Sequence, residues 1–205
     1  ASYFRAIGRA MAYGLSARAV AIGTGGPKAE EVPRFTHLRV YAAVNGTVRL
    51  EAVIDSPSLA GHLDMTLRPG GNTETDITVT LMPRQDIHTI GVAPLTSMFF
   101  KSPMRSATAD DYRPRVHDSN VLVIENGAGE QLWRPLANPS SIQTSAFLDD
   151  GPSSFGLWQT PRSFAAFQDS EARYHERPSA RVVPAHDWGP GAVMLVEIPT
   201  SDEFM

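Results

Sequence analysis

Asn45-Gly-Thr-Val48-Arg-Leu-Glu-Ala-Val-Ile54 is the stretch that decides the fold. Apolar and polar residues alternate from Val48 to Ile54, and they also alternate before the Asn-Gly pair, from Phe35 to Val44. Alternation with a period of two is typical of a half-buried strand. An Asn-Gly pair between two such runs is the strongest short signal for a hairpin. The pattern therefore predicts two antiparallel strands joined by a tight turn.

The same alternation continues along the chain after this hairpin. It recurs in residues 59–67 and 73–82, on either side of the turn sequence Pro69-Gly-Gly-Asn72. Successive alternating runs joined by short turns predict an antiparallel meander from Val48 to Met82. A sheet with one apolar face needs a second layer to cover that face.

Short β-rich runs also fill most of the remaining sequence. We expect bent strands within residues 3–22, a turn at 23–28, and strands at 87–92, 94–100, 121–124, 131–134, 142–148, 154–159, 180–183 and 192–198. One helix is predicted over about Ser163 to Tyr174, because Phe164 and Phe167 recur at helical spacing after Pro161. The predicted fold is mainly β: a large two-layer antiparallel β-sandwich that forms a single domain over residues 1–205.

Composition excludes several classes of function. The net charge of -4 and the lack of any Lys or Arg run argue against a nucleic-acid partner or an anionic membrane surface. No apolar run is long enough for an integral membrane segment. The chain has no cysteine, which removes disulfides, thiolate catalysis and Cys-ligated zinc. Its six histidines show no i, i+4 pair, so neither a metal site nor a cofactor is expected.

A dense polar stretch interrupts the predicted strands at Asp110-Asp-Tyr-Arg-Pro-Arg-Val-His-Asp-Ser-Asn120. Its charged groups are too closely spaced for a buried strand, and Pro114 excludes a helix interior. The stretch therefore predicts a loop held by flanking strands, a common place for a functional site. A solvated turn without function is the alternative that the composition leaves open.

The C-terminal half contains the residue types that bind and process sugars. Such a site uses carboxyl groups on both sides of the scissile bond, with aromatic faces and Arg or amide groups to hold the rings and hydroxyls. The candidate substrate-binding residues are Arg113, His117, Ser119, Trp133, Arg134, Trp158, Gln159, Tyr174 and Arg177. Buried structural tryptophans with satisfied N–H groups would explain the same clustering.

Two further features have a simpler explanation. The triplet His117-Asp118-Ser119 holds the residue types of a catalytic triad, but consecutive side chains point away from one another and no Gly-x-Ser-x-Gly sequence occurs. A serine hydrolase is therefore disfavoured. Glu197 lies in the apolar run Val193 to Ile198, where an inward-facing carboxylate needs a partner, such as an Arg from the preceding stretch.

Several separated blocks resemble one known family. They are Tyr13-Gly-Leu-Ser-Ala-Arg18, Ala93-Pro-Leu-Thr-Ser-Met-Phe99, Tyr112-Arg-Pro-Arg-Val-His-Asp-Ser119, Trp133-Arg-Pro-Leu136, Phe155-Gly-Leu157, Gln168-Asp-Ser-Glu-Ala-Arg-Tyr174, Arg177-Pro-Ser179 and Val196-Glu-Ile-Pro-Thr200. Together they resemble the OpgG/OpgD (MdoG) family of osmoregulated periplasmic glucan biosynthesis in Gram-negative bacteria. The resemblance runs from about Tyr3 to Glu203, which is nearly the whole chain.

This resemblance implies a fold and a location. The implied fold is a β-sandwich of galactose-mutarotase type, followed in full-length members by a smaller immunoglobulin-like domain. The chain is then expected to be a partial domain that lacks N-terminal strands and that second domain, with the uncovered sheet edges exposed. The implied location is the periplasm.

The resemblance also implies an activity on β-1,2-linked glucan. Some members are similar to inverting endo-β-1,2-glucanases, with one acid in the His-Asp-Ser stretch and another after the Pro-Thr strand end. The first matches Asp118, which is expected to donate a proton to the glycosidic oxygen. The second would follow Asp202-Glu-Phe-Met205, so only half of the pair is expected in this sequence.

Three hypotheses follow for the function. The first is a glucan-cleaving protein that uses Asp118, with Arg113 and His117 holding the glucan. The second is a non-catalytic glucan-binding or scaffold protein of the same pathway, acting with other glucan-biosynthesis proteins or as a homodimer. The third is a β-sandwich without a site, which would show no saturable glucan binding.

Overall fold

The computed structural model describes residues 2–104 and 110–200. Their contacts form two compact units: the first contains residues 1–11 and 16–96, and the second contains residues 12–15 and 97–205. Both units consist mostly of antiparallel strands, so the prediction of a mainly β, antiparallel fold is confirmed. The prediction of a single domain over residues 1–205 stays a prediction.

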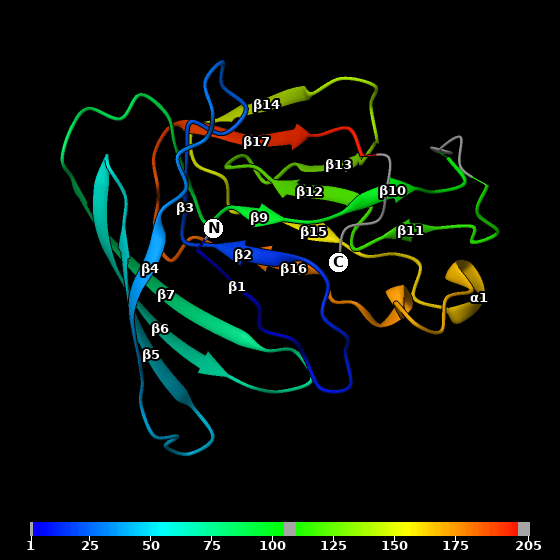
Figure 1. Cartoon of the computed structure of the whole chain (residues 1–205), viewed down its shortest axis with the longest axis horizontal. Helices are drawn as coiled ribbons and strands as arrows, with labels where there is room; N and C mark the ends of the chain where they lie inside the picture. The colour runs from blue at the N-terminus through cyan, green and yellow to red at the C-terminus, as the bar shows by residue number, and fades with distance from the viewer. Residues whose placement is uncertain (1, 105–109, 201–205) are drawn as a thin grey trace. The chain divides into compact units, whose positions relative to one another are not determined.

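The first unit contains the predicted meander (Figure 1). Its strands are β4 (Arg34–Val40), β5 (Val48–Asp55), β6 (Leu59–Arg68) and β7 (Glu74–Pro83), which pair in sequence order. Asn45 and Gly46 both have positive φ, 49° and 76°. A two-residue type I′ hairpin turn requires this backbone, and Asn and Gly adopt it most readily. The predicted hairpin is therefore confirmed.

Five short strands complete the first unit. One sheet contains β1 (Tyr3–Phe4), β2 (Ser16–Arg18) and β9 (Leu95–Thr96), and another pairs β3 (Val20–Ile22) with β8 (Ile90–Val92). The buried core consists of Ala19, Val20, Ile22, Ala52, Ile54, Leu59, Leu63 and Met65. Residues from β3 thus cover the apolar face of β5 and β6. Each fully buried Leu or Ile contributes about 1.5–3 kcal/mol to this packing.

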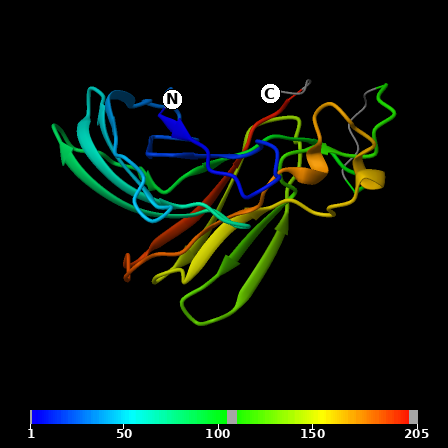
Figure 2. The same ribbon diagram turned by 90° about the horizontal axis from the view of Figure 1, so that it is seen from below.

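The second unit is built on a four-stranded sheet (Figures 1 and 2). Its order is β13 (Gln131–Pro135), β12 (Val121–Glu125), β15 (Ser154–Trp158) and β16 (Ala180–Val182). A separate pair consists of β14 (Gln143–Asp149) and β17 (Gly191–Glu197), and another of β10 (Phe99–Lys101) and β11 (Val116–His117). The predicted run 94–100 is therefore two short strands, β9 and β10, rather than one.

The predicted helix over Ser163 to Tyr174 is wrong in extent. The chain forms only α1 (Phe164–Phe167) and a 3₁₀ turn, η1 (Tyr174–Glu176). Gln168 ends α1 with φ 55°, and Arg173 precedes η1 with φ 51°. These left-handed residues break the helix because an α-helix needs negative φ throughout. Of the aromatic residues in this segment, Phe167 and Tyr174 lie in one buried cluster with Met98, Phe100, Val116 and Ala172, whereas Phe164 is exposed.

Candidate functional site

The polar stretch from Asp110 to Asn120 is partly a strand and is largely buried at its end. Val116 and His117 form β11, and the exposed fractions of His117, Asp118 and Ser119 are 0%, 7% and 0%. Three consecutive buried polar residues each need a partner, because an unpaired buried polar group costs about 1–3 kcal/mol. The solvated-turn alternative does not describe this part of the stretch.

His117 is held between aromatic rings and one amide. Its ring stacks on Phe99 at 5.6 Å between centroids and meets the edge of Phe167 at 5.1 Å. Gln159 Nε2 donates to the carbonyls of His117 (2.7 Å) and Tyr174 (2.8 Å). Gln159 Oε1 is then the acceptor for His117 Nδ1, at 2.7 Å, so the imidazole proton lies on Nδ1.

Burial keeps this imidazole neutral. It lowers the pKa of His117 to about 4, with a smaller contribution from the positive charge of Arg115, while the hydrogen bond with Gln159 acts in the opposite direction. A neutral imidazole whose Nδ1 proton is committed to Gln159 cannot also serve as a cation for a glucan hydroxyl. His117 and Gln159 therefore form a rigid support immediately beside Asp118.

Asp118 is paired with Arg177 inside the second unit. Arg177 Nη1 donates to Asp118 Oδ1, and Arg177 Nε donates to the carbonyl of Ala172 at 3.0 Å. The Arg177 guanidinium carbon lies 4.2 Å from the centroid of the Tyr174 ring, a cation–π contact. Gly14 leaves room for the Arg177 stem, since a Cβ at Gly14 would lie 2.9 Å from Arg177 Cβ. The Asp118 carboxylate and its partner Arg177 thus bring together three segments of the sequence: Tyr112–Ser119, Gln168–Tyr174 and Arg177–Ser179.

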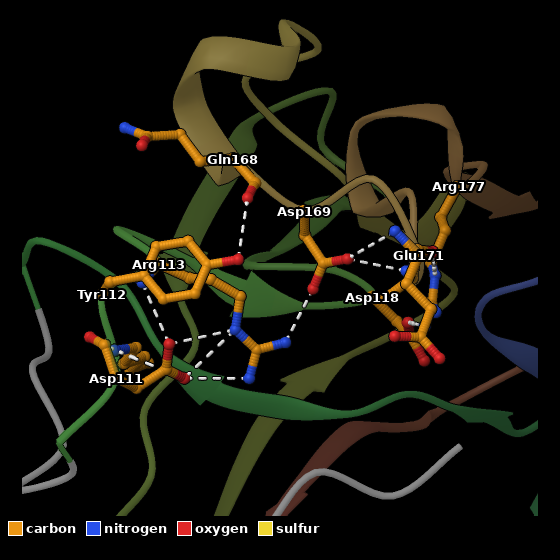
Figure 3. A network of polar contacts seen from close by, with 10 residues as sticks. Asp111, Tyr112, Arg113, Asp118, Gln168, Asp169, Glu171 and Arg177 are labelled. Atoms are coloured by element: carbon orange, nitrogen blue, oxygen red, sulfur yellow. Dashed lines mark hydrogen bonds and ion pairs between the residues drawn. The ribbon is translucent and has the colours of Figure 1, made fainter.

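A second charged network lies next to this pair (Figure 3). Arg113 donates to Asp111 through Nε (3.0 Å) and Nη2 (2.9 Å), and to Asp169 Oδ2 through Nη1 (2.7 Å). Lys101, which is buried, donates through Nζ to the Asp111 carbonyl at 2.8 Å. The hydrogen bonds from Arg113 lower the pKa of Asp111 to about 2 against the effect of burial, and the charge of Lys101 adds to this.

The remaining candidates lie elsewhere in the second unit. Trp133 and Trp158 share one face of the four-stranded sheet, where their ring centroids are 6.4 Å apart and Trp133 is 57% exposed. Arg134 lies on the opposite face with Leu122 and Leu157, because side chains alternate along a strand. Its Nη2 donates to buried Glu197 at 2.7 Å. Glu197 therefore has the Arg partner that its position requires, although Arg134 comes from a different stretch than expected.

Several residues of this region were not among the candidates from the sequence. Ser97 shares a short hydrogen bond with Ser119, so Ser119 is a packing hydroxyl with a fixed partner. Asn138 donates to the carbonyls of Phe100 (3.2 Å) and Thr200 (2.8 Å), which holds the end of the Val196–Thr200 segment beside β10. Asp169 accepts from Arg113 and from the backbone N–H groups of Glu171 and Ala172. The side-chain and backbone partners of Ser97, Asn138 and Asp169 outside the Asp169 turn are 22 to 62 residues away in sequence, so residue spacing could not identify them.

Comparison with known proteins shows which family the chain resembles. A family profile described as "Periplasmic glucan biosynthesis protein, MdoG" matches residues 1–205. The chain belongs to the MdoG family. Its relatives include Glucans biosynthesis protein G of Vibrio cholerae, 51% identical over 206 residues, and of Shewanella frigidimarina, 50% identical over 206 residues. Glucans biosynthesis protein G 1 of Shewanella oneidensis is 49% identical over the same length.

The match covers all of this chain but only part of its relatives. Each alignment includes 100% of the chain, yet 38% of the Vibrio cholerae protein and 37% of the Shewanella frigidimarina protein. The resemblance to the MdoG family and the expectation of a partial chain are confirmed. The end of the resembling stretch, residues 201–205, lies outside the described part of the structure.

Within the MdoG-family chain, the buried groups define the chemistry available. The described residues contain no cluster of three or more His, Asp or Glu side chains that could hold a metal ion. No helix in the described ranges is long and apolar enough to cross a membrane. What the site offers is a carboxylate, Asp118, held by a buried cation and flanked by a neutral imidazole. This arrangement suits proton transfer to or from a bound hydroxyl or water.

Proposed function

We propose that the chain forms part of a site that cleaves β-1,2-linked glucan in the periplasm by inverting hydrolysis, with Asp118 as one of two catalytic carboxyl groups. The observation that carries the proposal is the buried Asp118–Arg177 pair, in a chain whose family is described as periplasmic glucan biosynthesis proteins. Buried charges with specific partners concentrate at functional sites.

The contacts of Asp118 indicate which of the two carboxyl roles it has. A guanidinium held against a carboxyl group favours the ionised form, which can accept a proton from an attacking water. Proton donation to the leaving oxygen would require Asp118 to carry a proton beside the Arg177 guanidinium, which disfavours the protonated form. We therefore assign Asp118 the role of general base, in place of the proton donor expected from the resemblance.

The surrounding candidates divide between glucan binding and support. Arg177, whose guanidinium lies against Asp118, is proposed to contact the sugar, whereas the fully buried Tyr174 is proposed to support that guanidinium through its ring. His117, Ser119 and Gln159 have internal partners and are proposed to hold Asp118 in place. Arg113 is committed to Asp111 and Asp169 and is proposed to act through them.

Replacing Asp118 with Asn tests the proposal. In the protein at its full natural length, Asp118→Asn should reduce the release of reducing ends from linear β-1,2-glucan by at least 10²-fold, because general-base catalysis contributes about 10²–10⁴-fold. Asp110→Asn, an exposed position in the same stretch, is the matched control and should retain wild-type activity. Undiminished release by Asp118→Asn would exclude a catalytic role.

A substrate with an activated leaving group separates the two roles. An aryl β-1,2-gluco-oligosaccharide needs little protonation of its leaving oxygen, so a variant that has lost its general acid recovers turnover on it. A variant that has lost its general base does not. Asp118→Asn should stay inactive on both substrates, and recovery on the aryl substrate would return Asp118 to the acid role.

The Trp133–Trp158 pair, in which Trp133 is exposed and Trp158 is half-buried, favours a second candidate function: glucan binding without turnover, as in a scaffold that works with other glucan-biosynthesis proteins or as a homodimer. Exposed aromatic faces stack on the apolar faces of sugar rings, and these two rings need no carboxylate to do so. Saturable binding of linear β-1,2-glucan that is lost in Trp133→Ala, without any new reducing ends from the wild type, would support this candidate over hydrolysis.

A further inference from the structure

Asp169 occupies a buried position between the two charged networks of the second unit, and its exposed fraction is 5%. Its two carboxylate oxygens have different partners (Figure 3). Oδ2 accepts from Arg113 Nη1 at 2.7 Å. Oδ1 accepts from the backbone N–H groups of Glu171 at 3.0 Å and Ala172 at 2.7 Å. One oxygen therefore fixes a side chain, and the other fixes a turn of the backbone.

The backbone turn that Asp169 fixes also holds Arg177. The N–H of Ala172 donates to Asp169, and the carbonyl of the same residue accepts from Arg177 Nε at 3.0 Å. Arg177 then uses Nη1 to contact Asp118. The peptide at Ala172 is thus the link between Asp169 and the Arg177 guanidinium. If the turn relaxed, Arg177 would lose the acceptor that sets the rotation of its guanidinium plane.

We propose that Asp169 is a positioning residue that holds Arg177 against Asp118 through the turn Asp169–Ala172. Asp169 touches neither the sugar nor Asp118 in this role. The geometric part of the inference, from Asp169 to Arg177, stands by itself. Its consequence for turnover rests on the proposed function of Asp118.

The two oxygens of Asp169 make unequal contributions to this role. Arg113 keeps two hydrogen bonds to Asp111 whether or not Asp169 is charged. Burial acts to raise the pKa of Asp169, but the hydrogen bonds from Arg113 and from the N–H groups of Ala172 and Glu171 outweigh it and leave the pKa below its usual value. The turn requires only an acceptor oxygen at Oδ1, and an amide also provides one.

Two substitutions at this position therefore have different outcomes. Asp169→Asn keeps an acceptor oxygen for the turn but loses the ion pair with Arg113. Asp169→Ala loses both. Glu171→Ala is the matched control, because its exposed side chain lies in the same turn while its backbone N–H is unchanged.

The experiment follows Arg177 directly and turnover separately. In full-length protein labelled with ¹⁵N-arginine, the hydrogen-bonded Nε–H signal assigned with Arg177→Lys should persist in Asp169→Asn and Glu171→Ala and disappear in Asp169→Ala. On linear β-1,2-glucan, kcat should fall roughly 10- to 100-fold in Asp169→Ala, since small misplacements near reacting groups cost up to about 10²-fold. In Asp169→Asn it should stay close to the wild-type value.

Each result decides one part of the inference. Persistence of the Arg177 signal in Asp169→Ala overturns the positioning role. Loss of the signal in both Asp169 variants overturns the route through the turn and assigns the effect to the Arg113 ion pair. If the signals change as expected while even the wild type produces no reducing ends, the positioning of Arg177 stands and the proposed hydrolysis fails. Thermal unfolding of the two variants shows whether either change merely destabilises the fold.

Discussion

His117 should contribute to the destabilisation of the second unit by acid, before the paired carboxylates Asp111 and Asp169 do so at lower pH. Its pKa is about 4 in the folded protein, whereas 6.5 is the ordinary value for an exposed imidazole. The unfolded chain therefore binds a proton at a pH where folded His117 does not. Above pH 6.5 neither state is protonated and the contribution of His117 to stability is fully present. Between pH 6.5 and 4 the unfolded state holds more protons, so stability falls as the pH falls.

The size of the effect follows from the difference between these two pKa values. Each unit corresponds to about 1.4 kcal/mol, so the free energy of unfolding should decrease by about 3 kcal/mol over the whole window. The physical source is the environment of the ring: protonated His117 would carry a charge between Phe99 and Phe167, at a fully buried position.

Two measurements check this prediction. In NMR spectra, the imidazole signals of His117 should stay in their neutral positions down to about pH 5. In denaturant unfolding from pH 7 to 4.5, His117→Gln should flatten the decline in stability, because Gln does not titrate. The other five histidines are present in both proteins and cancel in the comparison. A His117 midpoint near 6.5, or equal slopes for the two proteins, would refute the reasoning.

Three further substitutions test the packing and the buried ion pair of the second unit. Gly156→Ala should destabilise the protein by about 2 kcal/mol or more in denaturant unfolding, because its new Cβ would lie 2.1 Å from the Ala180 carbonyl oxygen and force β15 and β16 apart. Gly129→Ala is the comparison: its Cβ would lie in open space, but its φ is positive, so the substitution should cost about 1 kcal/mol. Glu197→Gln should cost about 1–2 kcal/mol by weakening the contacts to Arg134 Nη2 and the Ala137 N–H, and unchanged stability would show that the buried charge is not needed.

The fold was predictable where local rules determine it. The hairpin at Asn45-Gly46 needs two residues with positive φ, and the sequence provides the two residue types best suited to that turn. The helix predicted over Ser163 to Tyr174 failed for a physical reason. Phe164, Phe167 and Tyr174 are spaced for one helical face, but the left-handed Gln168 and Arg173 and the turn bound by Asp169 divide the segment.

The site was predictable only in part. The block around Asp118 and the segment containing Arg177 were both candidates, and the structure brings them into contact. Asp169 and Asn138 were not found, because each works through hydrogen bonds to backbone groups, which any residue type can provide. Trp133 and Arg134 were both candidates for one substrate-binding site, yet adjacent residues in a strand face opposite sides of the sheet. Sequence proximity thus placed together two side chains that the fold separates.

The hydrogen bonds of Gln159 make this position sensitive to a change that leaves its shape intact. Its Nε2 faces two carbonyl oxygens, those of His117 and Tyr174. Deamidation to Glu would replace this double donor with an oxygen of nearly the same size. The new carboxylate oxygen would then face the carbonyl oxygens of His117 and Tyr174 without a proton between them, and its negative charge would be buried. Position 159 therefore requires an amide, and deamidation of Gln159 would weaken the contacts that join its segment to those of His117 and Tyr174.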